Sequence, residues 1–330
     1  MKQKLLTELK TGEKVDHFLI ITKMEERLTK AGKPFLSIDM RDKSNDINAK
    51  VWDNFESLIK NAEAGKIVKI TGKIEEFNNI PQIKVESIRL ASESDNVSAD
   101  DFMPKSEREL SVMLKELETR IAQIQNTHLV SLIKKILSGN KFEKYKLVPA
   151  GKAWHHAYVH GLLEHTLELI KICDLMCDIH SEVNRDILIT GAILHDFGKT
   201  EELSHETSFD YTDKGKLIGH IVIAAIEIEK AANSINSFPD DLKDQVIHLV
   251  LSHQGKVEHA SPVEPKTLEA IVLYHADELS AKANAYKGAI KTDENKEGSW
   301  TRFLPLAGTS LFIPDKETKD DFEKGTLFDN

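Results

Sequence analysis

The first ninety residues alternate apolar and polar positions over short stretches, a pattern that is typical of half-buried strands. Turn-forming residues separate five such stretches, which are residues 15–24, 34–41, 47–52, 67–74 and 80–90. Residues 55–62 instead carry apolar positions at helical spacing, and Asp53 or Asn54 precedes them as the expected helix cap. The predicted order is therefore three strands, one helix and two strands.

That order is the order of an OB-fold, a small closed barrel that often binds single-stranded nucleic acid. Such a barrel binds a strand through a basic groove and through aromatic rings on which bases stack. We therefore expect residues 1–91 to form an all-β OB-fold domain. The candidate nucleic-acid contacts are Trp52, Arg41, Phe35 and Lys50. The competing interpretation is that the aromatic side chains among them fill the barrel core.

The rest of the chain has a different pattern. Residues 92–105 are mostly small, polar and acidic, which is typical of a linker. Apolar residues then recur at helical spacing, which predicts a helical connecting segment over residues 106–149 and an all-α domain over residues 150–290. Residues 291–330 form a C-terminal tail. The chain is thus predicted to be multidomain, with a β-barrel followed by an all-α domain.

Composition and charge agree with this division. The 330 residues are 40% hydrophobic and 30% charged, which describes an ordinary soluble protein of two domains. Residues 1–91 hold 17 Lys and Arg against 14 Asp and Glu, whereas the remainder holds 27 against 40. The barrel half is therefore the candidate for binding a polyanion. No apolar run approaches the roughly 20 residues of a transmembrane helix, so we expect a cytoplasmic protein without a membrane partner.

The predicted helical domain carries a His-Asp pair at the end of an apolar run. Residues 187–194 are Ile-Leu-Ile-Thr-Gly-Ala-Ile-Leu, and His195 and Asp196 follow directly. Gly198 is expected to let the chain turn away with Lys199. Imidazole and carboxylate are ligands that suit Zn, Mn and Fe alike. A His-Asp pair alone is a weak signal, but it makes this turn a candidate metal site.

Four more residues complete an ordered set of His, His-Asp, His, His and Asp, and they are His165, His220, His253 and Asp277. This order resembles the HD-domain superfamily of metal-dependent phosphohydrolases. The resemblance implies a first metal held by His165, His195, Asp196 and Asp277. It implies a second metal held by His220, His253 and Asp196, whose carboxylate can bridge two ions. Lys199 would contact a substrate phosphate as a point charge. Taken singly, each of these residues is also explained by packing or by a salt bridge.

Three segments indicate a particular family within the HD-domain superfamily. Residues 153–166 read Ala-Trp-His-His-Ala-Tyr-Val-His-Gly-Leu-Leu-Glu-His-Thr, residues 193–199 read Ile-Leu-His-Asp-Phe-Gly-Lys, and residues 273–282 read Leu-Tyr-His-Ala-Asp-Glu-Leu-Ser-Ala-Lys. With a barrel, a linker and an HD domain in that order, they resemble the YhaM family of bacterial 3′→5′ exoribonucleases. His160 departs from the family pattern, which has a small residue there.

The resemblance implies that nucleoside 5′-monophosphates are removed stepwise from the 3′ end of single-stranded RNA, with single-stranded DNA as a second substrate. Metal-activated hydroxide would attack the terminal phosphodiester. Two divalent ions are expected, with Mn²⁺ favoured over Co²⁺, Fe²⁺, Mg²⁺ or Zn²⁺. His156 is a further candidate nucleic-acid contact. Whether the chain forms a homo-oligomer stays open.

Two alternatives remain at this point. The first is an HD-domain phosphohydrolase of a small nucleotide, which would not need a strand-binding barrel. The second is a non-catalytic RNA-binding protein whose metal centre is structural. Metal-dependent turnover excludes the second alternative, and the relative rates on oligonucleotides and small nucleotides decide the first.

Overall fold

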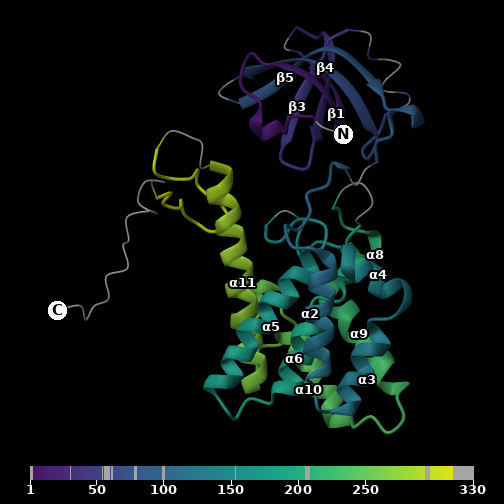
Figure 1. Cartoon of the computed structure of the whole chain (residues 1–330), viewed down its shortest axis with the longest axis vertical. Coiled ribbons are helices and arrows are strands. Elements are labelled where there is room, and N and C mark those ends of the chain that lie inside the picture. The colour runs from purple at the N-terminus through teal and green to yellow at the C-terminus, as the bar shows by residue number, and fades with distance from the viewer. Residues whose placement is uncertain are drawn as a thin grey trace, which may run out of the picture.

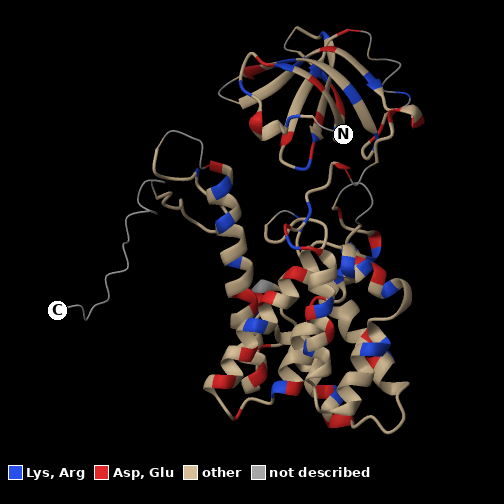
Figure 2. Cartoon of the chain, in the orientation of Figure 1, with Lys and Arg blue, Asp and Glu red and all other residues tan. Residues whose placement is uncertain are grey.

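The computed structural model describes residues 3–29, 31–53, 55, 60, 62–77, 80–98, 101–152, 154–204, 209–293 and 298–314. A β-barrel lies above a larger helical domain, and the linker runs between them (Figure 1). The predicted fold class, a β-barrel followed by an all-α domain, is confirmed. Lys and Arg are interspersed with Asp and Glu on both domains, so neither domain is covered by charge of a single sign (Figure 2).

Five strands form the closed barrel, in the neighbour order β1-β2-β3-β5-β4. They are β1 (Lys14–Leu28), β2 (Pro34–Arg41), β3 (Asp46–Val51), β4 (Ile67–Phe77) and β5 (Ile80–Leu90). The β3–β5 pair is parallel and closes the barrel, while the other pairs are antiparallel. The predicted helix over residues 55–62 lies largely outside the described residues.

Alternating side chains of these strands point inward and form the barrel core, which includes Leu19, Ile21, Ile38, Ala49 and Val68. This is the period-2 burial that the sequence pattern predicts.

Gly72 allows β4 and β5 to approach closely where their register shifts. The shift lies between Thr71 and Gly72. A Cβ atom at residue 72 would lie 2.2 Å from the carbonyl oxygen of Lys84, so a side chain there would push the two strands apart. A bulge of this kind increases local twist and curvature, which a small barrel needs in order to close.

Adjacent residues of the linker are anchored to different domains. Phe102 is buried against Phe18 and Ile20 of the barrel. Met103 is buried against Val159 and Phe209 of the helical domain. The domains are therefore attached to each other through packed side chains as well as through the backbone.

The helical domain has one continuous apolar core. Its helices are α2 (Leu110–Ala122), α3 (Thr127–Ile136), α4 (Gly139–Leu147), α5 (Gly161–Ile179), α6 (Arg185–Leu194), α7 (Lys199–Glu202), α8 (Asp213–Ile218), α9 (His220–Asn233), α10 (Asp240–Ser252) and α11 (Leu268–Asp293). Helix α6 is buried along its whole length from Ile187 onward and packs against α5, α10 and α11. The residues that directly follow Leu194 therefore lie in the centre of the domain.

Helix α11 extends beyond the bundle toward the level of the barrel (Figure 1). The chain then folds back on itself, with isolated bridges that pair Trp300 with Phe312 and Leu304 with Thr309. Trp300 and Phe303 remain exposed. Among the helices that the structure describes, none combines the length and apolar character needed to cross a membrane.

Candidate metal centre and nucleic-acid surface

The six predicted metal ligands come from five helices or their ends and converge at one place. His165 lies in α5, His195 and Asp196 follow α6, His220 begins α9, His253 follows α10, and Asp277 lies in α11. Their ligand atoms form two compact groups, one of His165, His195 and Asp277 and the other of Asp196, His220 and His253. Five of the six side chains lie on helices that pack directly on α6, or at the ends of those helices or of α6 itself. This packing brings together His165 and Asp277, which are 112 positions apart in the sequence.

Within the first group, His165 Nε2 lies 2.9 Å from Asp277 Oδ1. His195 Nε2 lies 3.9 Å from the same oxygen. One carboxylate oxygen therefore faces two imidazole nitrogens, which is an arrangement that can hold a cation between them.

Asp196 connects the two groups. Its Oδ2 lies 3.3 Å from His195 Nε2. Its Oδ1 lies 3.4 Å from His220 Nε2 and 3.6 Å from His253 Nε2. The two oxygens thus face different imidazole groups, as is required of a carboxylate that bridges two ions.

The opposite nitrogen of each imidazole is held by a fixed partner. For two of them the partner is a main-chain carbonyl, since His195 Nδ1 is 2.9 Å from the oxygen of Ala192 and His253 Nδ1 is 2.7 Å from that of Val250. A carbonyl can only accept a hydrogen bond, so Nδ1 carries the proton and Nε2 presents its lone pair to the centre.

The other two imidazoles are held by side chains. His220 Nδ1 is 3.0 Å from Glu202 Oε1. His165 Nδ1 is 3.1 Å from Ser280 Oγ, and that hydroxyl donates to Glu168 Oε2 at 3.0 Å. Carboxylates behind metal-binding imidazoles orient the ring and raise its basicity as a ligand.

Several inward-facing atoms are buried and have no hydrogen-bond partner within the described residues. They are the Nε2 atoms of His165, His195 and His220 and the Oδ1 atom of Asp196. A buried polar atom without a partner costs about 1–3 kcal/mol, and such atoms are rare. Divalent cations would satisfy all four at once, so the residues fit the metal site that the sequence predicts.

The electrostatics of the site keep both carboxylates ionised and His253 neutral. Burial would raise the pKa of Asp196, but the Lys199 cation and the contact with His195 outweigh it and hold that pKa well below its usual range. The pKa of Asp277 is lowered in the same way by His165. Burial lowers the pKa of His253 to about 4. At neutral pH the carboxylates are therefore ionised and His253 is a neutral ligand.

Gly198 has a different role from the expected one. Its backbone is helical, with φ −59° and ψ −20°, so a turn reserved for glycine is not the reason for its presence. Instead, a Cβ atom there would lie 1.9 Å from the carbonyl oxygen of His220. The missing side chain lets the start of α9 pack directly on the His-Asp turn, which brings His220 to Asp196.

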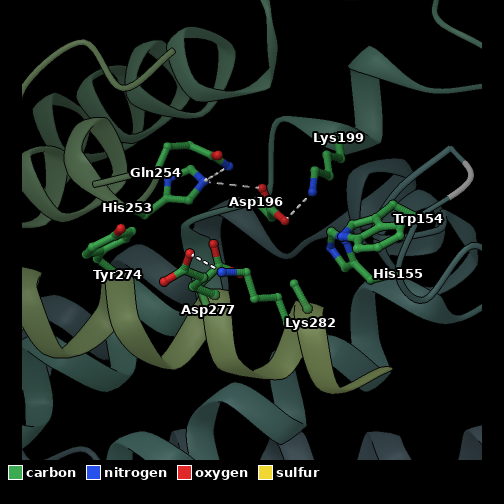
Figure 3. A pocket seen from close by; sticks show the side chains of 11 residues that line it. Trp154, His155, Asp196, Lys199, His253, Gln254, Tyr274, Asp277 and Lys282 are labelled. Atoms are coloured by element: carbon green, nitrogen blue, oxygen red, sulfur yellow. Dashed lines mark hydrogen bonds and ion pairs between the residues drawn. The ribbon is translucent and has the colours of Figure 1, made fainter. Parts of the chain in front are cut away.

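A pocket of about 200 Å³ opens onto this centre. Asp196 lies at its middle, with Trp154 and His155 on one side and His253 and Tyr274 on the other (Figure 3). Lys199 lines the pocket and lies 2.5 Å from Asp196 Oδ2.

Lys282 also lines the pocket, where it is exposed and ion-paired with Glu278 at 2.7 Å. Burial and the nearby Lys199 cation hold the pKa of His155 well below its usual range.

The barrel presents an aromatic and basic surface on the outer face of β2 and β3. Trp52 stacks on Phe35 with a centroid separation of 4.8 Å. The ammonium group of Lys50 lies 4.5 Å from the ring centroid of Phe77. Lys50 and Trp52 are two positions apart and so point to the same side. This face is the one with which OB-folds bind oligonucleotides.

Two other predicted contacts lie elsewhere. Arg41 is at the far end of β2 from Phe35, and its guanidinium group forms two hydrogen bonds of 2.9 Å with Asp46. His156 is buried in the helical domain. The structure therefore groups Phe35, Trp52 and Lys50 and separates Arg41 and His156 from them.

Comparison with known proteins decides the family. A model described as an HD domain matches residues 162–282, and one described as an OB-fold nucleic acid binding domain matches residues 20–91. The 3′-5′ exoribonuclease YhaM of Geobacillus sp. (strain WCH70) is 34% identical over 311 residues, which cover 94% of this chain and 94% of the relative. YhaM of Bacillus subtilis (strain 168) is 34% identical over 306 residues, 92% of this chain and 96% of the relative. The chain belongs to the YhaM family.

Membership of the YhaM family confirms the resemblance seen in the sequence. An HD domain also implies that the protein binds a divalent metal, in agreement with the two groups of His and Asp ligands. His160, where we expected a small residue, adopts φ +70°. A small residue such as glycine adopts that conformation without strain. Here the His160 ring is held instead by the carbonyl oxygen of Lys146, 2.6 Å from Nδ1.

Sequence reasoning missed the residues behind the ligands, which are Glu202, Glu168 and Ser280. Glu168 lies three positions after His165 and Ser280 three positions after Asp277, so each shares a helix face with a ligand. The sequence does not show that Glu168 and Ser280, 112 positions apart, meet each other. Glu202 has a comparable signal, because it lies one helical turn after Lys199.

Proposed function

We propose that this chain is a metal-dependent 3′→5′ exoribonuclease that degrades single-stranded RNA to nucleoside 5′-monophosphates. The observation that carries the proposal is that the two oxygens of Asp196 face two different imidazole groups in one open pocket. That arrangement fits hydrolysis of a phosphodiester, and the attached barrel fits capture of a single strand.

The proposed ligands of the first ion are His165, His195, Asp196 and Asp277, and those of the second are His220, His253 and Asp196. When bound, two divalent ions supply a nucleophile at neutral pH and neutralise charge on the phosphoryl oxygens. Mn²⁺ is the proposed ion because the resemblance to the YhaM family favours it, and the imidazole and carboxylate ligands are compatible with it.

The other pocket residues position the substrate. Lys199 is nearly buried, and its ammonium group is held beside Asp196, so a phosphoryl oxygen that binds near Asp196 meets a fixed positive charge. Lys282 is exposed at the pocket and adds a second cation for the incoming backbone. We propose that both lysines hold the terminal phosphodiester against the ligand cluster.

The barrel supplies affinity for the strand. Base stacking on the Phe35–Trp52 pair does not depend strongly on sequence, because every base has a π-face. Lys50 adds charge that attracts a backbone phosphate. The same features would accept single-stranded DNA, which we propose as a second substrate.

The test uses the purified full-length protein, Mn²⁺ and a 5′-labelled single-stranded RNA, sampled over time on a sequencing gel. We expect a ladder that shortens from the 3′ end and that chelator abolishes. Asp196→Asn should lower the rate by at least about 100-fold, since metal ions contribute several kcal/mol of charge stabilisation, and it should leave RNA binding in a gel-shift assay intact. An Asp196→Asn protein that degrades RNA at the parental rate would disprove the proposed metal site.

A parallel assay with cyclic dinucleotides and (p)ppGpp separates this proposal from the small-nucleotide alternative. Faster turnover of any of these than of the oligonucleotide would show that the barrel has a role other than strand capture.

A further inference from the structure

His155 lines the pocket, but its imidazole is not one of the six proposed metal ligands. Both ring nitrogens of His155 are buried and have no hydrogen-bond partner among the residues that the structure describes, although His155 lines the pocket beside Asp196 and Lys199. An imidazole has at least one N–H donor, and a buried donor without a partner is destabilising. A ligand that enters the pocket and accepts a hydrogen bond would remove that penalty.

The segment that carries His155 is fixed in place. The backbone N–H of His156 donates to Asn284 Oδ1 of α11 at 2.8 Å. The carbonyl oxygen of His156 accepts hydrogen bonds from the backbone N–H groups of Ala150 and Tyr158, at 3.2 and 2.9 Å. His156 itself has φ +42°, which turns its side chain away from the direction of its neighbour. His155 and Trp154 are thus held over α11 by a tight turn.

The two adjacent histidines face different partners. His156 Nε2 lies 3.1 Å from Glu168 Oε2, and Glu168 accepts the hydroxyl of Ser280, which contacts His165. His156 therefore stands behind a proposed metal ligand. His155 instead faces the pocket together with Trp154, opposite His253 and Tyr274 (Figure 3).

We propose that Trp154 and His155 form the subsite for the 3′-terminal nucleotide, with the Trp154 indole stacking on its base and the His155 imidazole donating a hydrogen bond to its phosphate. The inference rests on the proposed exoribonuclease activity, and it names the nucleoside 5′-monophosphate as the ligand of this side of the pocket. Stacking on an aromatic ring accepts all bases, which suits an enzyme that must remove each nucleotide in turn.

The geometry orders the parts of the bound nucleotide. Its phosphate, the group that is attacked, lies near Asp196 and Lys199, and His155 offers a neutral donor on the side of the pocket that also holds Trp154. Trp154 forms one side of the pocket (Figure 3), and the proposal places the base along that side.

The competing role for His155 is that of an additional metal ligand, because its ring lies 5.3 Å from that of His165, centroid to centroid. Metal content separates the two roles. A ligand variant loses bound metal, whereas a substrate-contacting variant keeps it.

The experiment compares four variants of the full-length protein with the parent, loaded with Mn²⁺. His155→Ala should keep the parental metal content and lose about 100-fold in kcat on RNA, as removal of one preorganised donor typically does. His156→Ala is the matched control, and it should lower Mn²⁺ affinity by about 10–100-fold and recover activity at saturating Mn²⁺. His155→Ala should not recover at any Mn²⁺ concentration.

Trp154→Ala should raise KM for RNA and weaken inhibition by AMP, each by about 10-fold, the loss expected for one stacked base. Trp300→Ala removes an exposed tryptophan outside the pocket and should change neither. Parental kinetics in both Trp154→Ala and His155→Ala, or loss of metal in His155→Ala, would overturn the subsite.

RNA degradation by the parent protein tests the exoribonuclease proposal independently of the subsite. A parent that leaves RNA intact refutes the exoribonuclease proposal. In that case, AMP binding to the Mn²⁺-loaded parent, measured by titration calorimetry, still supports the subsite if Trp154→Ala weakens that binding by about 10-fold, and refutes the subsite if the AMP affinity is unchanged.

Discussion

The carbonyl oxygen of His220 occupies the space into which a side chain at Gly198 would project, 1.9 Å from an ideal Cβ atom. This contact joins the turn after α6 to the first residue of α9. It makes the position of one proposed ligand, His220, depend on the size of a residue two positions after another, Asp196.

Gly198→Ala should therefore displace α9 and separate His220 from Asp196. We expect weaker Mn²⁺ binding, lower activity and a loss of stability of about 1–3 kcal/mol, the usual effect of overpacking a buried contact. Gly288→Ala is the matched control, because Gly288 is exposed in α11 and a Cβ atom there would meet nothing within 4 Å. That substitution should stabilise the helix slightly. Urea denaturation and Mn²⁺ titration of both variants test the difference, and equal behaviour would contradict the proposed role of Gly198.

Glu202→Gln should lower Mn²⁺ affinity by about 10–100-fold, because Glu202 orients His220 through contacts of 3.0 Å with its ring and its backbone N–H. Its neighbour Glu201 provides the control. Glu201 is ion-paired with Lys214 at the surface. Glu201→Gln should bind Mn²⁺ like the parent. If calorimetry gave the same affinity for both variants, Glu202 would not be part of the metal site.

Trp52→Ala should weaken binding of single-stranded RNA by about 10-fold, the cost of one lost stacking interaction. Arg41→Gln should have little effect on RNA binding, because Asp46 already pairs with the Arg41 charge. Gel-shift titration measures both, and metal content should not change in either. A larger loss in Arg41→Gln than in Trp52→Ala would place the strand on a different face of the barrel.

Tyr145→Phe should destabilise the helical domain by about 1–3 kcal/mol, since a buried donor is removed and its acceptors lose a partner. The Tyr145 hydroxyl lies 2.9 Å from Thr166 Oγ1 and 3.1 Å from the carbonyl oxygen of Ile193. These contacts tie α4 to α5 and to the end of α6. Thermal unfolding should show the loss, while the activity per folded molecule stays near the parental value. A large fall in activity with no change in stability would point instead to a role in the reaction.

Mn²⁺ should raise the unfolding temperature of the parent protein in proportion to the logarithm of its concentration, because the ion binds only the folded arrangement of the ligands. The buried atoms without partners are the reason for the gain. Asp196→Asn should reduce the shift strongly. An unfolding temperature that does not respond to Mn²⁺ or to chelator would argue against a metal centre at these residues.

Much of the fold could be predicted because its signals are local. Alternation of apolar and polar positions indicates the barrel strands, and apolar periodicity indicates the helices. The order of His165, the His-Asp pair, His220, His253 and Asp277 resembles that of HD-domain enzymes, and this resemblance predicted that these residues meet.

What the sequence does not contain is the packing between distant segments. The turn that directs His155 and His156 to opposite sides depends on Asn284, which lies 128 positions away from His156. The sequence likewise does not show that Asp46 pairs with Arg41. That pairing decides whether the Arg41 guanidinium group is free to contact RNA.

The anchoring of Phe102 to the barrel and of Met103 to the helical domain has a consequence for the size of the final products. If the two domains are held at a fixed separation, only RNA above a minimum length can contact the barrel surface and the pocket at the same time. A remnant below that length loses the affinity that the barrel contributes and dissociates. Digestion should therefore slow abruptly at one short length and leave oligonucleotides of uniform size, and a flexible insertion between Phe102 and Met103 should make that size variable.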